Sequence, residues 1–437
     1  MRFDLLRTKQ LLGVATCSVT SPVRSLCGGP LEPEAPPRSM FKHLTSKIRA
    51  TGPLSVAEYM REVLTNPVSG YYVTKEALGP DGDFITSPEI SQVFGELLGV
   101  WVVSEWMAAG RPGRLQVVEL GPGRGSLAAD VLRVLSQLRS VLGGASPSLH
   151  LVEVSPVLSR LQAQRLTGDQ HQEVQDHEQL VYRRGETAQG VPVRWYRGLD
   201  AVPAGFSVFL AHEFFDALPI HKFQRTHKGW REVLVDVDPD SPTRLRFVLA
   251  PTPTLASTTL IQADEGRDHV EVCAEGGAMV QQLARRIAEE GGAALIADYG
   301  HDGTKTDTFR GFKGHQLHEV LESPGLADLT ADVDFSYLRR MAEGGVACLG
   351  PLDQRTFLRN MGIEARMQVL LRNCSDVATR EQLINSYHVL MDPAQMGHRF
   401  QFLGLLHPGR LARPSPPQGL KLDRKPTPAP LPVAGFS

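Results

Sequence analysis

The sequence lacks any arrangement of cysteines that would build a disulfide framework or a structural zinc site. Its 437 residues contain five cysteines, which are widely spaced and never form a C-x-x-C motif: Cys17, Cys27, Cys273, Cys348 and Cys374. This odd number and wide spacing exclude the small disulfide-rich secreted domains and the common zinc modules. Isolated thiols are typical of a protein that works in a reducing compartment.

Long apolar runs and an excess of basic charge are also lacking. No run approaches the roughly 18 apolar residues that a membrane-spanning helix needs, so we expect no membrane span. The 46 lysines and arginines are balanced by 48 aspartates and glutamates. Because no basic field is available to attract phosphates, nucleic acid is not expected as the main partner. Hydrophobic residues make up 42% of the chain, which is enough for a sizeable core.

The two ends of the chain differ in composition from the middle. The first forty residues are rich in arginine and serine and carry a single acid, Asp4, before Glu32. Such leaders are typical of mitochondrial transit peptides, and we assign 1–40 to one. A secretory signal centred on 11–19 is disfavoured because polar residues interrupt that stretch. The other end, 408–437, is rich in proline, arginine and lysine, and is predicted to be disordered.

Strand and helix patterns alternate between these ends. Strands are expected at 114–119, 149–154, 191–196, 206–211, 293–298 and 400–406, and helices at 41–63, 88–109, 127–142, 156–165, 277–290 and 379–391. Such alternation predicts βαβ units and a parallel sheet that is covered by helices on both faces. We therefore expect an α/β fold with a Rossmann-like sheet in a domain at 111–407, preceded by an N-terminal helical flank at 41–110.

The alternation is interrupted near the middle of the chain. Two strand patterns, 230–237 and 244–250, flank the turn sequence Asp238-Pro239-Asp240-Ser241. This arrangement predicts a β-hairpin. We therefore expect an inserted hairpin and helical region near 220–290.

A glycine-rich segment, Glu119-Leu120-Gly121-Pro122-Gly123-Arg124-Gly125, joins a predicted strand to a predicted helix. Its three glycines permit positive φ and let a ligand approach the backbone closely. In a dinucleotide fingerprint the third glycine comes five positions after the first, whereas here it comes four positions after it. Glu119 would repel a pyrophosphate but attract a sulfonium and an α-amino group. The segment therefore favours S-adenosylmethionine over NAD, and the sheet of an S-adenosylmethionine-dependent methyltransferase.

Two further groups of residues could complete a cofactor site. Glu153 ends the next strand, where an acid can accept hydrogen bonds from both ribose hydroxyls. Thr86 and Ser87 stand at the N-terminus of a predicted helix, whose free N–H groups suit the carboxylate of the cofactor. A surface acid beside a tight turn and a plain capped helix are the alternatives at these positions.

A second polar constellation, His212-Glu213-Phe214-Phe215-Asp216, follows the strand at 206–211. It differs from the zinc motif H-E-x-x-H because an aspartate replaces the second histidine, and we assign no metal to it. The carboxyl end of a strand is where ligands bind in open α/β sheets. We therefore expect the methyl acceptor at this position.

Two positive charges must approach each other if the acceptor is a guanidinium. At about 4 Å and an effective dielectric near 20, a guanidinium and a sulfonium repel each other by roughly 4 kcal/mol. Carboxylates are then required, and Glu213 and Asp216 are the catalytic candidates. One of them could hold the guanidinium and accept its proton. Phe214 and Phe215 could wall the site. The alternative is that both phenylalanines are core residues and that Glu213 caps a helix.

Several motifs together resemble the MidA family of mitochondrial protein-arginine methyltransferases. They are Gly70-Tyr71-Tyr72, Gly82–Trp101, Glu119–Gly125, Ala211–Pro219, Asp298-Tyr299-Gly300 and Asp328–Leu338. The resemblance extends from about Phe41 to Leu406. One departure is His212, where bacterial-like members tend to have asparagine, so this position is given no role.

The resemblance implies S-adenosylmethionine as the methyl donor and symmetric dimethylation of an arginine. It also implies a location in the mitochondrial matrix, and a substrate that is a core subunit of the matrix arm of respiratory complex I, modified early in assembly. An alternative is a non-catalytic assembly chaperone that uses the methyltransferase fold only for docking. A nicotinamide-linked oxidoreductase is disfavoured by Glu119 and by the spacing of the glycines.

Overall fold

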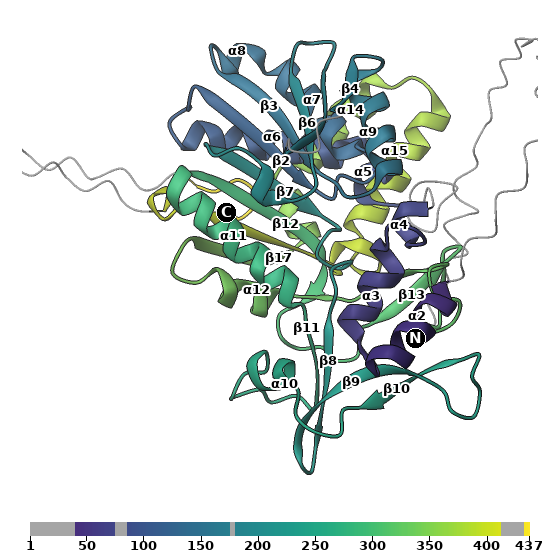
Figure 1. Cartoon of the computed structure of the whole chain (residues 1–437). Helices are drawn as coiled ribbons and strands as arrows, with labels where there is room; N and C mark the ends of the chain where they lie inside the picture. Colours follow the sequence, from purple (N-terminus) through teal and green to yellow (C-terminus); the bar gives the residue numbers. More distant parts are fainter. Residues whose placement is uncertain (1–39, 75–84, 175–179, 412–431) are drawn as a thin grey trace, which may run out of the picture.

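A central sheet forms the middle of the computed structural model, which describes residues 40–74, 85–174, 180–411 and 432–437 (Figure 1). Within these residues the strand order is β17-β18-β12-β7-β2-β3-β6-β5-β4, with β16 beside β12. Five neighbouring strands are parallel: β12 (Gly292–His301), β7 (Ser207–His212), β2 (Arg114–Leu120), β3 (Ser146–Val152) and β6 (Pro192–Tyr196). The predicted parallel sheet is therefore confirmed. The expected leader lies outside the described residues except for Met40.

Both edges of this sheet are antiparallel, which the sequence patterns did not indicate. At one edge β18 (Phe400–Leu406) runs against both β12 and β17 (Ala347–Asp353). At the other edge β5 (Val181–Glu186) runs against β6, and β4 (His171–Glu173) runs against β5. β4, β5 and β6 follow one another closely in the chain, and connections too short for a crossover helix can join only antiparallel neighbours.

Helices cover both faces of the sheet (Figure 1). Successive residues of each strand point to opposite faces, so Val117 belongs to one apolar core and Val118 to the other. The first core is closed by α6 (Gln92–Ala108), α7 (Ser126–Gln137), α8 (Arg139–Leu142), α9 (Pro156–Thr167), α13 (Gln354–Asn360), α14 (Ile363–Asn373) and α15 (Val377–Met391). The second core is closed by α11 (Ala274–Glu290), α12 (Phe335–Ala342) and the short η1 (Leu199–Ala201).

The helix expected at 88–109 is divided in two and does not belong to the N-terminal flank. α5 (Ser87–Ile90) is followed by Ser91, which has an extended φ of −152°. Ser91 caps α6 by accepting a hydrogen bond from the Val93 amide at 3.3 Å. Because α6 packs on the central sheet, the flank assigned to 41–110 is too long.

A third apolar core lies between the N-terminal helices and a smaller sheet. These elements are seen in the lower part of Figure 1. The helices are α2 (Met40–Thr51), α3 (Val56–Thr65) and α4 (Tyr71–Thr74). The sheet contains β1 (Leu54–Ser55), β8 (His221–Thr226), β9 (Gly229–Val237), β10 (Leu245–Leu249) and β11 (His269–Val272), and α10 (Leu255–Thr259) lies between β10 and β11 in the chain. The antiparallel β9–β10 pair confirms the predicted hairpin. The insertion expected near 220–290 ends before α11, which covers the central sheet.

A further small sheet was not expected from the sequence. It consists of β13 (Arg310–Lys313), β14 (Gln316–His318) and β15 (Asp328–Thr330), and β16 (Val333–Asp334) then returns to β12. His315 and His318, which stand at helical spacing in the sequence, belong to the β13–β14 hairpin, and His315 has a φ of +62°.

Residues near the C-terminus are ordered where a disordered tail was expected. After η2 (Pro393–Gly397) and β18, the short η3 (Pro408–Arg410) carries Arg410, which forms an ion pair with the buried Glu105 at 2.8 Å. Residues 412–431 lie outside the described part. Val433 is buried in the first core, and the ring of Phe436 packs against Phe357 at 5.4 Å. The prediction of disorder was made from the composition of the whole segment 408–437, in which these two apolar side chains have little weight.

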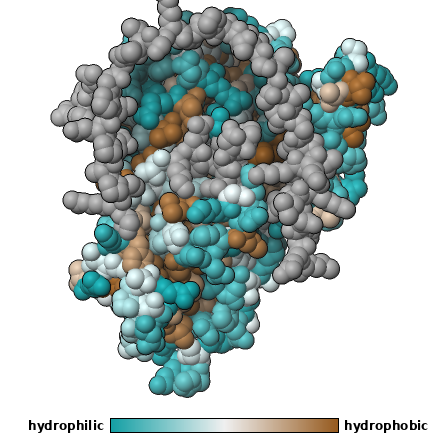
Figure 2. Space-filling model, turned by 90° about the vertical axis from the view of Figure 1, so that its right-hand side faces the viewer, coloured by the Kyte–Doolittle hydropathy of each residue, from teal (hydrophilic) through white to brown (hydrophobic). Residues whose placement is uncertain are grey.

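Where grey atoms do not cover the face in Figure 2, hydrophobic side chains form groups between hydrophilic ones. The most exposed large apolar residues, Leu255, Leu317 and Val68, lie on three different elements or loops. Among the described helices, none is long and apolar enough to cross a membrane.

We expect Phe436→Ala to lower the free energy of unfolding by about 2 kcal/mol, because it removes an aromatic ring from the edge of the first core. Urea denaturation would measure the change. Val68→Ala is the control, since Val68 is 71% exposed and should change stability by less than about 0.5 kcal/mol. Equal stabilities of Phe436→Ala and the parent would show that the C-terminal residues do not support the core.

Candidate cofactor and acceptor site

The glycine loop leaves the carboxyl end of β2, in the middle of the sheet. Gly121, Gly123 and Gly125 have φ values of +61°, +53° and +77°, a region that side chains other than glycine rarely adopt. A Cβ atom on Gly121 would lie 2.7 Å from the ring of Phe214. The loop therefore needs glycine both for its conformation and for its contact with the segment that follows β7.

Glu119 lies directly before this loop and is 3% exposed. Its Oε2 atom has no hydrogen-bond partner among the described residues. Burial, followed by the nearby carboxyls of Asp130 and Glu153, raises the pKa of Glu119 to about 8. A buried carboxylate without a partner is costly unless a ligand supplies a positive charge or a hydrogen-bond donor.

Glu153 follows the neighbouring strand β3 and is held by two hydrogen bonds. Its Oε1 accepts from the Ser155 amide at 2.7 Å, and its Oε2 accepts from Nε2 of Gln162 at 3.0 Å. Burial raises the pKa of Glu153 to about 7. The acid is thus fixed close to the glycine loop through Gln162, and its contact with the ribose of the cofactor stays a prediction.

Gln162 was missed in the sequence, although it joins the parts of this site. From the inner face of α9 its Nε2 also donates to the carbonyl oxygen of Gly123 at 2.7 Å, and its Oε1 accepts from Nε1 of Trp195 at 2.9 Å. A glutamine within a helical pattern is ordinarily exposed, so nothing in the sequence marked this one as buried.

Thr86 and Ser87 lie beside the segment that follows β7. Thr86 caps α5 in a capping box with Glu89, and the Ser87 amide donates to Oε1 of Glu213 at 3.4 Å. Ser87 is fully buried, and its Oγ has no partner among the described residues. Glu89 stands 3.7 Å from Arg124 of the glycine loop, which places α5 between the two polar constellations. Residues 82–84 of the same motif lie outside the described part.

The segment after β7, residues 213–216, carries both acceptor-site candidates and is called the acceptor loop below. Glu213 adopts a φ of +48°, which is uncommon for a residue other than glycine and is typical of functional sites. Its side chain is 9% exposed, and partial burial together with the charge of Asp216 raises its pKa well above the ordinary value.

Asp216 is clamped on one side only. Its Oδ2 accepts hydrogen bonds from the hydroxyl of Tyr299 and from Oγ1 of Thr330, the latter at 2.7 Å. Its Oδ1 is buried and has no partner among the described residues. Burial raises the pKa of Asp216. One carboxylate oxygen is therefore held in place while the other remains available.

His212 and the two phenylalanines have different surroundings. Burial lowers the pKa of His212 to about 3, and its ring contacts Phe94 and Phe400, so it is a neutral packing residue. Phe215 is 3% exposed and belongs to the second core, as the structural alternative proposed, whereas Phe214 covers the glycine loop.

Several buried polar atoms at the strand ends have no hydrogen-bond partner among the described residues. Nine buried polar atoms without a partner occur in the described part of the chain as a whole. Four of them lie at or beside the carboxyl ends of β2 and β7: Ser87 Oγ, Glu119 Oε2, Asp216 Oδ1, and His212 Nε2, which is 3.5 Å from Oε1 of Glu213. Such atoms are uncommon in folded proteins, and a group of them at one place is a candidate position for ligand atoms. Three of the four belong to acids or to a hydroxyl, which fits a cationic ligand that also bears a carboxylate.

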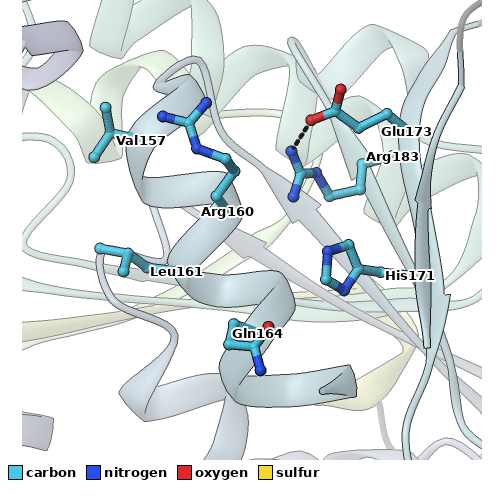
Figure 3. Close-up of a pocket in the computed structure, with 7 residues that line it drawn as sticks. All are labelled: Val157, Arg160, Leu161, Gln164, His171, Glu173 and Arg183. Atoms are coloured by element: carbon cyan, nitrogen blue, oxygen red, sulfur yellow. Dashed lines mark hydrogen bonds and ion pairs between the residues drawn. The ribbon is translucent and has the colours of Figure 1, made fainter. Parts of the chain in front are cut away.

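The cavity drawn in Figure 3 lies elsewhere, between the outer face of α9 and the β4–β5 hairpin. Its lining residues are Val157, Arg160, Leu161, Gln164, His171, Glu173 and Arg183. Arg183 and Glu173 form an ion pair across it at 2.5 Å. It contains none of the residues at the strand ends, so we do not assign the chemistry to it.

A glycine loop after the central strand of a parallel sheet, with buried carboxylates at the ends of the neighbouring strands, defines the class of Rossmann-like S-adenosylmethionine-dependent methyltransferases. Residues 97–352 match a family model described as "Putative S-adenosyl-L-methionine-dependent methyltransferase". The chain belongs to this family. The fold class and the cofactor predicted from the sequence are confirmed, which leaves no support for the nicotinamide alternative.

Relatives and solved structures agree with this assignment. The chain is 66% identical to "Protein arginine methyltransferase NDUFAF7, mitochondrial" of Danio rerio, over 92% of each chain. It is 57% identical to the Homo sapiens protein of the same name, over 92% of this chain and 91% of that one. A crystal structure from Burkholderia thailandensis, described as a "likely methyl transferase" bound to S-adenosyl-homocysteine, superposes with a TM-score of 0.70 at 26% identity, over 84% of this chain and 92% of that one.

We expect Glu119→Gln to weaken the binding of S-adenosylmethionine while stabilising the unligated protein at pH 8. Loss of a charge-assisted hydrogen bond costs about 1.5–3 kcal/mol, or roughly 10- to 150-fold in affinity. The folded state holds the Glu119 proton more tightly than the unfolded state does. The unligated protein should therefore lose stability as the pH rises from about 4.5 to about 8, and the variant should lose less.

Calorimetry would measure the affinity, and thermal unfolding between pH 5 and pH 8.5 would measure the stability. Glu289→Gln is the control, because Glu289 is exposed and distant from the glycine loop in the sequence. If Glu119→Gln bound the cofactor as tightly as the parent, Glu119 would have no role in the site.

Proposed function

We propose that the protein transfers methyl groups from S-adenosylmethionine to an arginine side chain of a protein, in the mitochondrial matrix. The observation that carries this proposal is the pair of buried carboxyls, Glu213 and Asp216, beside the cofactor loop. It is supported by relatives at 57–66% identity that are named mitochondrial protein arginine methyltransferases. Following the resemblance, the product is a symmetrically dimethylated arginine, made by a type II enzyme. The substrate is a core subunit of the matrix arm of complex I, modified early in assembly.

The acceptor loop has the groups that this reaction needs. Bound S-adenosylmethionine supplies the methyl group and a positive charge. A guanidinium that approaches this charge is repelled, and the two carboxyls offset the repulsion when they are ionised. The free Oδ1 of Asp216 can accept an N–H of the guanidinium and orient it.

The reaction also needs a group that accepts a proton from the guanidinium. A guanidinium that gains a methyl group and keeps a single positive charge must release one proton. Glu213 can accept it at a carboxylate oxygen, and the raised pKa of this group makes its carboxylate a stronger base than an exposed glutamate. Phe214, which lies against the glycine loop, limits the access of water to the reacting atoms.

We expect Glu213→Gln to leave cofactor affinity within about threefold of the parent and to lower the rate of methyl transfer by about 10²–10⁴-fold, the usual contribution of a general base. Filter binding of labelled donor, followed by transfer to the acceptor protein, would measure both quantities. Glu289→Gln again provides a variant of the same kind at an exposed position. A fully active Glu213→Gln would remove Glu213 from the mechanism.

Methylation of purified matrix-arm subunits with labelled donor tests the proposal as a whole. Mass spectrometry of the product should find a modified arginine, and fragmentation should distinguish symmetric from asymmetric dimethylation. A protein that bound a subunit but transferred no methyl group would support the docking chaperone instead. Methylation of lysine or of a small molecule would overturn the assignment of the acceptor.

A further inference from the structure

Four consecutive amides of the acceptor loop are bonded to two consecutive residues of β12. The Glu213 amide donates to the carbonyl oxygen of Ala297 at 3.0 Å. The amides of residues 214–216 then donate to one side-chain oxygen, Oδ2 of Asp298, at 3.2, 3.0 and 3.3 Å in order. No other side-chain oxygen of the described residues accepts three successive loop amides in this way.

Asp298 continues the hydrogen-bonded ladder between two strands. β7 and β12 are paired in parallel as far as His212 and Ala297, where β7 ends. The Glu213 amide still donates to a backbone carbonyl of β12, but from Phe214 onward the acceptor is the side-chain carboxyl of Asp298. Asp298 is fully buried, and its other oxygen, Oδ1, accepts from the Tyr299 amide at 3.0 Å, so the carboxylate cannot turn without breaking bonds on both sides.

These hydrogen bonds to β12 hold Glu213, the proposed proton acceptor, in a strained backbone conformation. The φ of +48° at Glu213 is unfavourable for a side chain with a Cβ atom, and such a conformation persists only where the surroundings impose it. The bonds that impose it come from β12 and not from the loop itself. Burial and the charges of Asp216 and Glu213 raise the pKa of Asp298, and its hydrogen bonds from the Asp216 and Tyr299 amides oppose this shift.

The next residue along β12 acts on the second carboxyl. The hydroxyl of Tyr299 donates to Oδ2 of Asp216, on the same oxygen that Thr330 binds. Asp298 thus fixes the backbone of the loop, and Tyr299 fixes the carboxyl that the loop carries. Asp298 and Tyr299 together therefore hold both the backbone and one side chain of the acceptor loop.

We propose that Asp298 is the positioning residue of the acceptor site. It holds the acceptor loop so that Glu213 and Asp216 face the methyl acceptor, and it does not itself touch the reacting atoms. The inference depends on the proposed function only for the identity of the reaction.

Asp298→Asn tests this role, since it keeps the volume of the side chain but replaces one carboxylate oxygen with an amide nitrogen. Displacement of a catalytic group by about 1 Å can cost on the order of 10²-fold in rate, so kcat should fall by about that factor. Cofactor affinity should stay within about threefold, because Glu119 lies in β2 and Glu153 follows β3, so neither belongs to β12 or to the acceptor loop. Asp302→Asn is the matched control, at an exposed ion pair with Arg339 beyond the end of the same strand.

Hydrogen–deuterium exchange provides a readout that a general loss of stability would not reproduce. In the parent protein the amides of 214–216 should exchange slowly. In Asp298→Asn these amides should exchange at least tenfold faster, and a tenfold change corresponds to ~1.4 kcal/mol in the free energy of opening. The exchange of the β2 and β3 amides should not change. Rapid exchange of these amides in the parent would overturn the proposal even if no variant could be purified.

The remaining outcomes are also decisive. Faster exchange with an unchanged kcat would show that catalysis does not need the anchored loop, and a lower kcat with unchanged exchange would show that Asp298 acts in some other way. Either result refutes the positioning role. If the parent protein methylated no arginine, the proposed function would fail, and the exchange comparison would still decide whether Asp298 holds the loop.

Discussion

Buried carboxyls at the ends of adjacent strands are the constraint on which the rest of this structure depends. Glu119 and Asp216 each keep an oxygen away from water with no partner among the described residues, which a folded protein tolerates at few positions. Their raised pKa values express the same cost, because burial disfavours the ionised form. A cation that binds beside them recovers this free energy. The site is thereby prepared for positive ligands at the expense of stability in their absence.

The segments outside the central sheet connect the two halves of the site. The Ser155 amide binds Glu153, and its hydroxyl donates to the carbonyl oxygen of Tyr72 in α4 at 2.6 Å. The hydroxyl of Tyr72 in turn donates to Asp328 at 2.7 Å, at the start of the strand whose last residue, Thr330, binds the acceptor-loop carboxyl. α4 and the β13–β15 sheet therefore connect Glu153 to Asp216 through a series of hydrogen bonds.

Local patterns in the sequence predicted the central strands, the glycine loop and the acids that follow the strands, because each of these depends on neighbouring residues. Glu119 could be identified in this way from its place at the end of a predicted strand, and Glu213 from the strand that precedes it. The partners that give the acids their geometry could not. Gln162 lies on a helix whose pattern shows only an amphipathic face, and Thr330 meets Asp216 across 114 positions of the chain. Such contacts follow from the order of the strands, which periodicity alone does not determine.

That order also explains why two constellations far apart in sequence form a single site. β2 lies between β3 and β7, and the chain runs from β2 to β3 on one side, continues to β6, and only then crosses to β7 on the other side. In open parallel sheets, ligands bind beyond the carboxyl ends of the strands at the point where the order reverses. The glycine loop and the acceptor loop flank this point, and Phe214 closes the space between them by lying against Gly121. Under the proposed function, this topology would bring a methyl donor at the first loop together with an acceptor at the second, and the acids there would favour positively charged groups over negative ones.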